Sequence, residues 1–456
     1  MPNADLERLP PSPNYRILAG SYGKLILRPW YDAMALGIVA DWFCPLSRAW
    51  AVASTSGGSI EKFSDELALP GLELSRYAGA VRRVSAAYRA YKQRCDDWES
   101  TFFGAESSSQ REMIQAHVAL FEGERGQLIG RRHFLALRRY LPPLKRAIAT
   151  PEQVHELQAP RLTEYPFPSP PDVEVTQSAS VQGEWGEEFH LKYHSPIGIA
   201  DDLARAHVFM PEKGEVRGTF IFLHGVGLEP GIWDALAYPA KALTRQGIRV
   251  VLPTGPWHGK RTLDGFFGGE NILRRGPLGF IEGFQAWVAE VALWTRWARS
   301  TADAPVGLGG ISLGALTAQL ASTAAMEWPE SDRSDALVLL TTTGDMNVLA
   351  FESGMVEKLH LIEGIQERGW SPETLKPWLP LLQPEETPGL SPDKIVMLLG
   401  SADRVTPFPG GKTLAERWKI PDSNLFIRKQ GHFSGALGLS HDAAPLQRFA
   451  DLLLQP

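Results

Sequence analysis

The stretch GLGGISLGALTAQL, from Gly307 to Leu320, decides the fold. An apolar run, APVGLGG, leads into it, and a run of good helix formers leads out of it. A single serine, Ser312, lies at the join, with Gly310 two residues before it and Gly314 two residues after it. The pattern predicts a buried strand, a tight corner and a helix. The serine is then either a plain turn residue or a nucleophile displayed at the corner.

The five residues around Ser312 fit the pattern G-x-S-x-G. In such a corner the serine has strained backbone angles and an exposed oxygen. Side chains at the two glycine positions would crowd the neighbouring strand and helix. Because a buried strand precedes the pattern and a helix follows it, we interpret Ser312 as a nucleophile.

The sequence around this corner alternates apolar, β-rich runs with helical ones. Strands are expected at 217–225, 248–256, 304–310, 335–344, 394–403 and 424–432, and helices at 234–247, 281–300 and 313–326. This alternation predicts a mostly parallel sheet covered by helices on both faces. Ligands of such sheets bind beyond the carboxyl ends of the strands, which is where the motifs fall.

A serine hydroxyl needs a base, and the base needs a carboxylate to hold its tautomer. His432, in QGHFSG, follows the last expected strand and is the predicted base. Asp403, in LLGSADRVTP, ends the strand before it and is the predicted acid. Asp345, one strand earlier, is the alternative acid. The chain order Ser, Asp, His is that of α/β-hydrolases.

The oxyanion that forms during acyl transfer needs backbone N–H donors. One is predicted at Leu313, directly after the nucleophile and at a helix N-terminus. The other is predicted in the loop after FIFLHG, at Val226 with Gly227 as the alternative. His224, in the same loop, is interpreted as a residue that organises the loop.

The motifs HGVG, GISLG, GSADRVTP and QGH resemble those of the α/β-hydrolase superfamily over roughly residues 175–456. The helical N-terminal extension, the HGVG loop and the loop PWHGKR resemble bacterial relatives of α/β-hydrolase domain-containing protein 18. The superfamily resemblance implies hydrolysis of an ester, thioester or amide through an acyl-serine. It names no substrate.

The predicted organisation has three parts: a helical N-terminal domain at 1–161, a Pro-rich linker at 162–175 and a catalytic domain at 176–456. Within the last part, the glycine-rich segment 257–279 is expected to be a lid loop, with Phe266 and Phe267 closing an acyl pocket. The segment 346–393 is expected to form cap helices over the active site, and a deep, partly apolar cleft is expected beneath.

The composition bears on the cellular location of the protein and on its binding partners. The net charge of -6 does not suggest nucleic-acid binding. The two cysteines make no disulfide framework, which favours a cytoplasmic location. Residues 76–146 carry 14 Lys and Arg against 7 Asp and Glu. We interpret these basic residues as solvated helix faces, with attraction between domains and membrane-surface contact as alternatives.

No phosphate-binding loop, dinucleotide fingerprint, paired-cysteine or H-E-x-x-H motif is complete, so no metal and no cofactor are expected. The sequence therefore predicts a serine hydrolase, specifically a carboxylesterase that cleaves a small ester with an apolar part. The alternatives are an amidase, thioesterase or carbon–carbon bond hydrolase with the same triad, and a non-catalytic binding protein. The N-terminal helices are a candidate homodimer interface.

Overall fold

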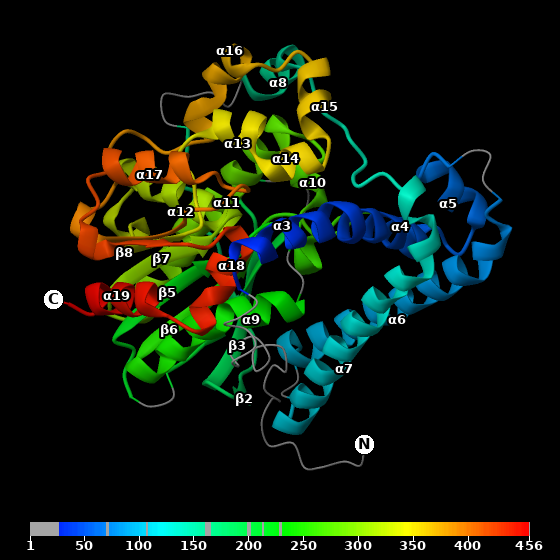
Figure 1. Cartoon of the computed structure of the whole chain (residues 1–456). Coiled ribbons are helices and arrows are strands. Elements are labelled where there is room, and N and C mark those ends of the chain that lie inside the picture. Colours follow the sequence, from blue (N-terminus) through cyan, green and yellow to red (C-terminus); the bar gives the residue numbers. More distant parts are fainter. Residues whose placement is uncertain are drawn as a thin grey trace.

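The protein is built on one ten-stranded sheet with helices on both faces and a helical extension (Figure 1). The structure is a computed structural model, and it describes residues 27–69, 73–105, 108–159, 166–197, 202–211, 214–227 and 230–455. The predicted linker at 162–175 therefore lies partly outside the described residues. From residue 166 to the first strand, the described part of that segment has no regular structure.

The sheet has the strand order β1-β3-β4-β6-β5-β7-β8-β9-β10, with β2 paired to β3. β5 to β10 are parallel, and β4 is antiparallel to both of its neighbours. The strands are β1 (Thr176–Gln177), β2 (Val181–Gly183), β3 (Gly186–His194), β4 (Leu203–Phe209), β5 (Gly218–Leu223), β6 (Ile248–Thr254), β7 (Val306–Ile311), β8 (Ala336–Leu340), β9 (Ile395–Gly400) and β10 (Leu425–Arg428). The strand order reverses beside β5, which places a ligand-binding crevice at the carboxyl ends of β5 and β7.

The sheet separates two apolar cores because successive side chains of a strand point to opposite faces. In β5, Phe220 and Phe222 face one core, and Ile221 and Leu223 face the other. The first core packs under α9 (Pro230–Lys241), α18 (His432–Leu437) and α19 (Ala444–Leu453). The second packs under α11 (Pro277–Thr301), α12 (Leu313–Ala324) and α17 (Phe408–Arg417). The predicted α/β fold, with helices on both faces of a mostly parallel sheet, is confirmed.

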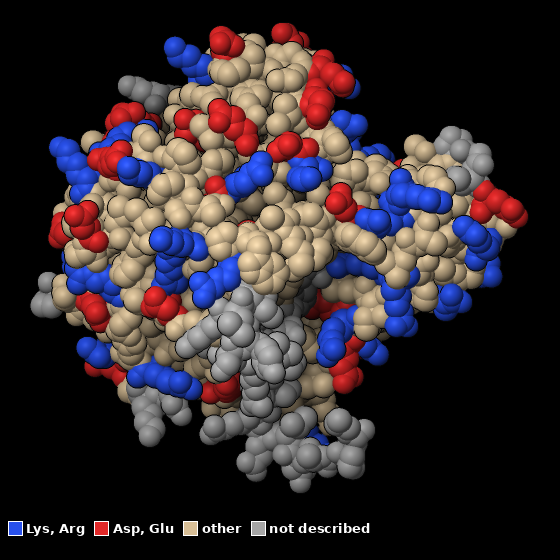
Figure 2. Space-filling view, viewed as in Figure 1, with Lys and Arg blue, Asp and Glu red and all other residues tan. Residues whose placement is uncertain are grey.

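The second core continues without a break into the N-terminal helices. These helices are α3 (Pro29–Ile38), the π-helix η1 (Val39–Phe43), α4 (Cys44–Thr55), α5 (Ile60–Glu66), η2 (Ser75–Tyr77), α6 (Ala78–Phe103), α7 (Gln110–Ile129), η3 (Gly130–Tyr140) and α8 (Pro151–Gln158). Figure 1 shows α6 and α7 projecting on one side, while α3 runs back to α18. In Figure 2, basic side chains predominate over the projecting helices, and Arg82, Arg83, Arg89 and Lys92 are exposed.

Short helices occupy the segment 346–393, where the sequence analysis expects a cap. They are α13 (Met346–Glu352), α14 (Gly354–Lys358), α15 (Leu361–Glu367), α16 (Pro372–Leu375), η9 (Lys376–Leu381) and η10 (Pro392–Lys394). The indole of Trp370 donates a hydrogen bond to the carbonyl of Ala149 at 2.7 Å, and Arg146 donates to the carbonyl of His360 at 3.2 Å. Hydrogen bonds therefore join the cap helices to the end of the N-terminal extension.

The segment 257–279, predicted as a lid loop, is folded and largely buried. It contains η6 (Gly259–Arg261), α10 (Glu270–Leu273) and the first residues of α11. Phe267 is 3% exposed and packs edge-on against Phe43, while the Arg48 guanidinium lies over the ring of Phe266. Both rings therefore pack against the N-terminal helices. In the described part of the chain, no helix is both long and apolar enough to cross a membrane.

Two histidines, His224 and His258, are completely buried and three more are partly buried, and desolvation lowers the pKa of all five imidazolium groups. They are His117, His190, His207, His224 and His258, the last with a pKa of about 4. The rings of His190 and His207 stack with their centroids 4.2 Å apart. All five therefore bind protons less readily in the folded protein than in the unfolded chain.

Lowering the pH from 7 to 5 is expected to lower the melting temperature. Below pH 6.5 the unfolded chain binds more protons at these histidines than the folded protein does, so stability present above pH 6.5 is lost as the pH falls. Each net proton changes the slope by about 1.4 kcal/mol per pH unit. Glu188 and Glu270 act in the opposite direction, because burial raises the pKa of each carboxyl, that of Glu188 to about 7. These are two carboxyl groups against five histidines.

Differential scanning fluorimetry at pH 5, 6 and 7 measures this slope directly. His190→Gln removes one of these imidazoles and is expected to make the slope shallower. His155→Gln, at an exposed position on α8, is the matched control and leaves the slope unchanged. A melting temperature that stays constant or rises between pH 7 and 5 contradicts the prediction.

Candidate active site

The backbone at Ser312 forms a strained corner between β7 and α12. Its φ of 55° and ψ of -117° are unfavourable for a residue with a side chain. A Cβ added at Gly310 would lie 2.4 Å from the carbonyl carbon of Gly314. A Cβ added at Gly314 would lie 2.4 Å from the carbonyl oxygen of Leu223. The two glycines are therefore required by space, and the corner holds Ser312 at the carboxyl end of β7.

The structure brings Ser312, His432 and Asp403 into one chain of hydrogen bonds. The Ser312 hydroxyl lies 2.9 Å from Nε2 of His432, and Nδ1 of His432 lies 2.8 Å from Oδ2 of Asp403. The three residues are 8%, 6% and 6% exposed. With Nδ1–H donating to the carboxylate, Nε2 is left as an acceptor for the serine proton.

The loop after β9 fixes the orientation of Asp403. Oδ1 accepts hydrogen bonds from the N–H groups of Val405 and Thr406, at 2.8 and 3.0 Å. The Thr406 hydroxyl lies 2.9 Å from Oδ2, so both carboxylate oxygens are engaged. Asp345, the alternative acid, has another role. It caps α13 by accepting from the N–H groups of Asn347 and Val348.

Leu313, one of the two predicted oxyanion donors, directly follows Ser312 and begins α12, so its N–H has no partner within the helix. Val226, the other, follows Gly225, where an added Cβ would lie 3.4 Å from Cβ of Ser312. Within the described chain, the N–H of Val226 donates to no other residue. The N–H of the alternative donor, Gly227, is already directed at Nε2 of His258, 3.3 Å away.

Two neutral histidines fasten the loop that carries Val226. Nδ1 of His258 donates to the carbonyl of Pro256 at 2.8 Å, which leaves Nε2 free to accept from Gly227. Nε2 of His224 accepts from the N–H of Gly255 at 2.9 Å. Both histidines are completely buried, and burial lowers the pKa of each. His224 and His258 therefore join the loop after β5 to the loop after β6.

A buried ion-pair group anchors the second of these loops. The terminal nitrogens of Arg261 donate to the two carboxylate oxygens of Glu290 at 2.8 and 2.7 Å, and Nε donates to Asp202 at 2.8 Å. Burial opposes the charge of Arg261, but the two carboxylates outweigh it and raise the pKa of the guanidinium. The Ser195 hydroxyl completes the group by donating to Glu290 at 2.6 Å.

A residue that the sequence did not single out holds the loop of His432. The Asp32 carboxylate, on α3, accepts hydrogen bonds from the N–H groups of Gly431, Phe433 and Ser434, at 3.2, 2.7 and 2.9 Å. It also accepts from the hydroxyl of Ser434. Asp32 is buried and caps the N-terminus of α18, where a carboxylate is favoured. The N-terminal extension therefore supports the candidate base directly.

No group of three or more His, Cys, Asp or Glu residues in the described ranges is arranged to hold a metal ion. The candidate site consists of a hydroxyl, an imidazole, a carboxylate and two backbone N–H groups. This set is able to carry out proton transfer, nucleophilic attack and stabilisation of an oxyanion.

Comparison with known proteins gives matches among solved structures only. No protein-family model matches the chain, and no curated protein does. One similar structure is a cold-adapted esterase from an Arctic intertidal metagenomic library, at 16% identity over 60% of this chain and 97% of that one, with a TM-score of 0.39. Acetyl xylan esterase 1 from Thermoanaerobacterium sp. is similar at 15% identity over 68% and 96%, with a TM-score of 0.43. A serine hydrolase without lid from Xanthomonas campestris is similar at 18% identity over 64% and 98%, with a TM-score of 0.33.

The arrangement of the sheet defines the fold of the protein. In strands β3 to β10, one strand, β4, is antiparallel to the rest. The serine corner lies between the central strand β7 and α12. The chain therefore has the mostly parallel α/β fold, covered by helices, that the sequence predicted.

Proposed function

We propose that the protein is a serine hydrolase, specifically a carboxylesterase. The chain of hydrogen bonds from Ser312 through His432 to Asp403, beside two N–H groups with no other described partner, carries this proposal. His432 takes the proton of the Ser312 hydroxyl while Oγ attacks the carbonyl carbon of the ester. The N–H groups of Leu313 and Val226 donate to the oxyanion that forms.

The remaining steps return every group to its starting state. The protonated His432 gives its proton to the leaving alkoxide, and an acyl-serine remains on Ser312. Water then attacks the acyl carbon and gives its proton to His432. The carboxylic acid leaves as the serine regains its hydrogen. Asp403 stays ionised throughout and stabilises the imidazolium that forms in both steps.

An apolar cavity of about 40 Å³ lies under the helices of segment 346–393. Its walls are apolar side chains of α10, α11 and these helices, among them Leu273, Phe280, Met346 and Leu349. It is far smaller than the roughly 300–1,000 Å³ of small-molecule sites, and neither Ser312 nor His432 lines it. The apolar part of the proposed substrate therefore rests on the sequence alone.

Labelling with a fluorophosphonate probe, followed by peptide mapping, tests the nucleophile. A series of p-nitrophenyl esters, measured beside a thioester and an anilide, tests the bond that is cleaved. Label on Ser312 and turnover of the esters are the expected results. Label on Ser312 with turnover of the anilide or thioester alone would replace the esterase proposal with an amidase or thioesterase. A folded protein that takes no label would favour a binding function.

Asp32→Ala is expected to lower kcat for ester hydrolysis about 100-fold with little change in KM. The substitution leaves the three N–H groups of the His432 loop without their acceptor, and a displacement of about 1 Å in a catalytic group costs about this much. Asp32→Asn is expected to fall between, because one amide oxygen keeps two of these hydrogen bonds and the amide NH₂ opposes the third. Steady-state kinetics measured well below the melting temperature separate this effect from lost stability.

The control for this prediction is Asp41→Ala. Asp41 is an exposed carboxylate a short distance along the same helical segment, in η1, and its side chain makes no contact with the loop of His432. The rate of fluorophosphonate labelling at Ser312 is a second measurement, because it depends on the base and not on substrate binding. An Asp32→Ala protein that labels and turns over at the rate of Asp41→Ala would show that Asp32 does not position His432.

A further inference from the structure

An apolar stripe of large side chains lies on the outside of the N-terminal extension, along α3 and η1. Its four members are each 45% to 56% exposed: Trp30, Met34, Ile38 and Trp42. They recur every four residues and so follow one side of the helical segment. The residues halfway between them, Asp32, Leu36 and Ala40, are buried. The segment therefore turns large apolar side chains toward solvent, and a contiguous patch of this kind marks an interaction surface.

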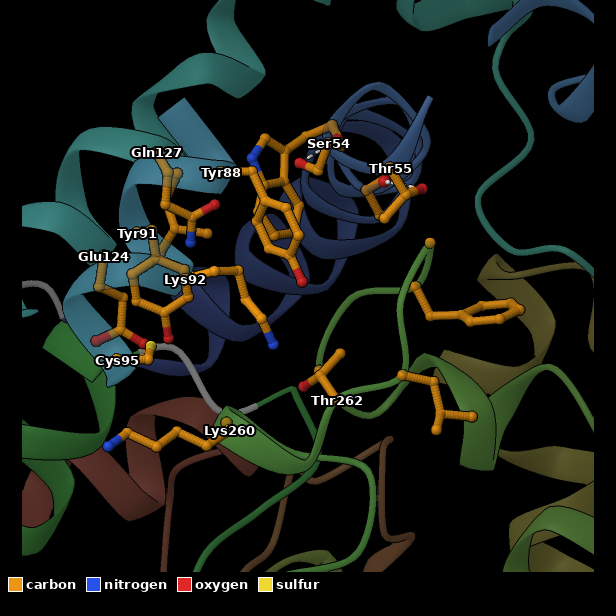
Figure 3. A pocket seen from close by; sticks show the side chains of 18 of the residues that line it. Ser54, Thr55, Tyr88, Tyr91, Lys92, Cys95, Glu124, Gln127, Lys260 and Thr262 are labelled. Carbon is orange, nitrogen blue, oxygen red and sulfur yellow. Dashed lines mark hydrogen bonds between the residues drawn. The ribbon is translucent and has the colours of Figure 1, made fainter. Parts of the chain in front are cut away.

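The apolar stripe is not the wall of the cavity behind the N-terminal helices. That cavity, of about 350 Å³, lies between α4, α6, α7 and the segment 257–279, and Figure 3 shows Thr55 on α4 and Tyr88 on α6 beside it. None of the four stripe residues lines it. On the inner side of α3, the Asp32 carboxylate accepts hydrogen bonds from the loop of His432. The helix is therefore held from its inner side while the apolar stripe faces outward.

Basic side chains lie at the start of the apolar stripe. Arg28 directly precedes α3, and Lys429 directly follows β10. Both are exposed, and both line one open groove. A third basic residue of this groove, Arg428, is already paired with Asp442 at 2.7 Å. In Figure 2 the surface over α3 is almost free of charged side chains, with Lys and Arg to either side of it.

Basic side chains also lie at the other end of the apolar stripe, on η3. The guanidinium of Arg138 is 3.9 Å from the ring centroid of Trp42, so η3 borders the stripe there. Arg132, Leu135 and Arg138 are three residues apart on this 3₁₀-helix and share one side of it. Arg132 is exposed and Leu135 is 47% exposed, so this side of η3 continues the stripe and adds positive charge.

Acidic residues do not cancel this charge. Asp41, in η1, is an exposed carboxylate beside Trp42 in the sequence. Glu357, on α14, which packs against α3, forms an ion pair with Arg404 at 3.5 Å. The basic side chains at the two ends therefore outweigh the carboxylate of Asp41, and the surface around the apolar stripe suits an anionic partner.

A bilayer fits this surface better than a second copy of the chain does. A two-fold pairing of copies would set the basic ends of one stripe against the basic ends of the other, and like charges repel. At a bilayer surface, Trp side chains lie at the boundary between headgroups and acyl chains, and Arg and Lys attract anionic headgroups. The apolar stripe has a Trp near each end and basic groups beyond both.

We propose that the apolar stripe and its basic ends dock on the surface of a bilayer that contains anionic phospholipid. The segment α3–η1 lies along the surface, with the stripe among the headgroups and Arg28, Lys429, Arg132 and Arg138 beside the phosphates. Because Asp32 joins the inner side of α3 to the loop of His432, docking holds the candidate active site close to the membrane. The docking does not depend on the proposed hydrolysis.

Cosedimentation of the full-length protein with vesicles tests the apolar stripe. Vesicles of phosphatidylcholine alone are compared with vesicles in which one third of the lipid is phosphatidylglycerol. The unaltered protein is expected to bind the mixed vesicles at least about tenfold more tightly than phosphatidylcholine alone. Met34→Asp is expected to weaken binding to the mixed vesicles about tenfold or more, because it removes buried apolar area and brings a carboxylate to the lipid surface.

Met326→Asp is the matched control for that substitution. Met326 is 40% exposed in η7 (Ala325–Glu327), which follows α12. Because α12 starts at the carboxyl end of β7 and runs back along the sheet, η7 lies near the amino ends of the strands, away from α18 and α3. Its vesicle binding is expected to equal that of the unaltered protein. Melting temperatures of both variants check that each is folded.

A second pair of variants tests the basic ends. Arg132→Gln is expected to weaken binding to the mixed vesicles about fivefold and to leave binding to phosphatidylcholine unchanged. Arg217→Gln is the control, because Arg217 is exposed directly before β5, at the amino end of that strand.

Three results would overturn the proposal. The first is an unaltered protein that sediments with neither kind of vesicle. The second is a Met34→Asp protein that binds the mixed vesicles as tightly as Met326→Asp. The third is equal binding of the unaltered protein to both kinds of vesicle. If the protein binds no vesicles and gel filtration shows a dimer that Met34→Asp separates, the apolar stripe is a contact between copies instead.

Discussion

Ser312→Ala is expected to lower kcat for p-nitrophenyl ester hydrolysis by about 10⁴- to 10⁶-fold and to abolish fluorophosphonate labelling. The substitution removes the atom that attacks, so the residual rate comes only from binding and from the oxyanion donors Leu313 and Val226. Alanine has the same Cβ as serine, so it fits the corner with its φ of 55° as well as serine does. Folding should therefore be preserved, and circular dichroism together with the melting temperature checks this.

Ser322→Ala is the matched control for that substitution. Ser322 is buried on the same helix, α12, and its hydroxyl makes no hydrogen bond within the described chain. Removing it should leave turnover and labelling unchanged. Turnover by Ser312→Ala within tenfold of the Ser322→Ala protein would show that another residue is the nucleophile. The corner at Ser312 would then be a structural turn.

The corner at Ser312 was predictable because the residues that it requires are close together in the sequence. Two glycines flank the serine at fixed spacing, and the added-Cβ distances show why larger residues do not fit there. The parallel strands were predictable for a similar reason, since long apolar runs alternate with amphipathic helices. The antiparallel strands β3 and β4 were not assigned in advance. Their residues alternate between apolar and polar, and the polar members include Glu188 and His207.

Asp32 could not be found in the same way. It lies 401 positions from Phe433 in the sequence, and it interrupts an apolar segment in which a carboxylate looks like a solvated residue. Its role follows only from the packing of α3 against α18. The N-terminal extension is thus tied to the site by a long-range polar contact that no periodicity or motif reveals.

The segment 257–279 shows how buried ion pairs limit a reading from sequence. Its length and its glycines predicted a lid loop beside the catalytic face. The structure buries Arg261 against Glu290, and it buries Glu270 where Oε1 accepts from the N–H of Lys145 at 3.1 Å. A charge in the sequence does not reveal a partner that lies on another element, and a buried charge is tolerated only with such a partner.

Asp403→Asn is expected to lower kcat by about 10⁴-fold, whereas Asp345→Asn is expected to leave it within a fewfold of the unaltered protein. An amide at 403 donates toward His432 where the carboxylate accepted, so the imidazole is turned to the tautomer that cannot take the Ser312 proton. Asparagine at 345 still offers an oxygen to the first N–H groups of α13, since asparagine is as good an N-cap as aspartate. The two substitutions are identical in chemistry and differ only in what each carboxylate contacts.

The pH profile of kcat distinguishes a catalytic effect of Asp403→Asn from a loss of stability. If Asp403 orients and stabilises the imidazolium, the Asp403→Asn protein should recover part of its activity as the pH rises and hydroxide takes over the role of the base. A loss of activity in Asp345→Asn equal to that in Asp403→Asn would contradict the assignment. So would a full rate in Asp403→Asn. The distances favour Asp403, because its Oδ2 lies 2.8 Å from Nδ1 of His432, while the Asp345 side chain is occupied at the start of α13.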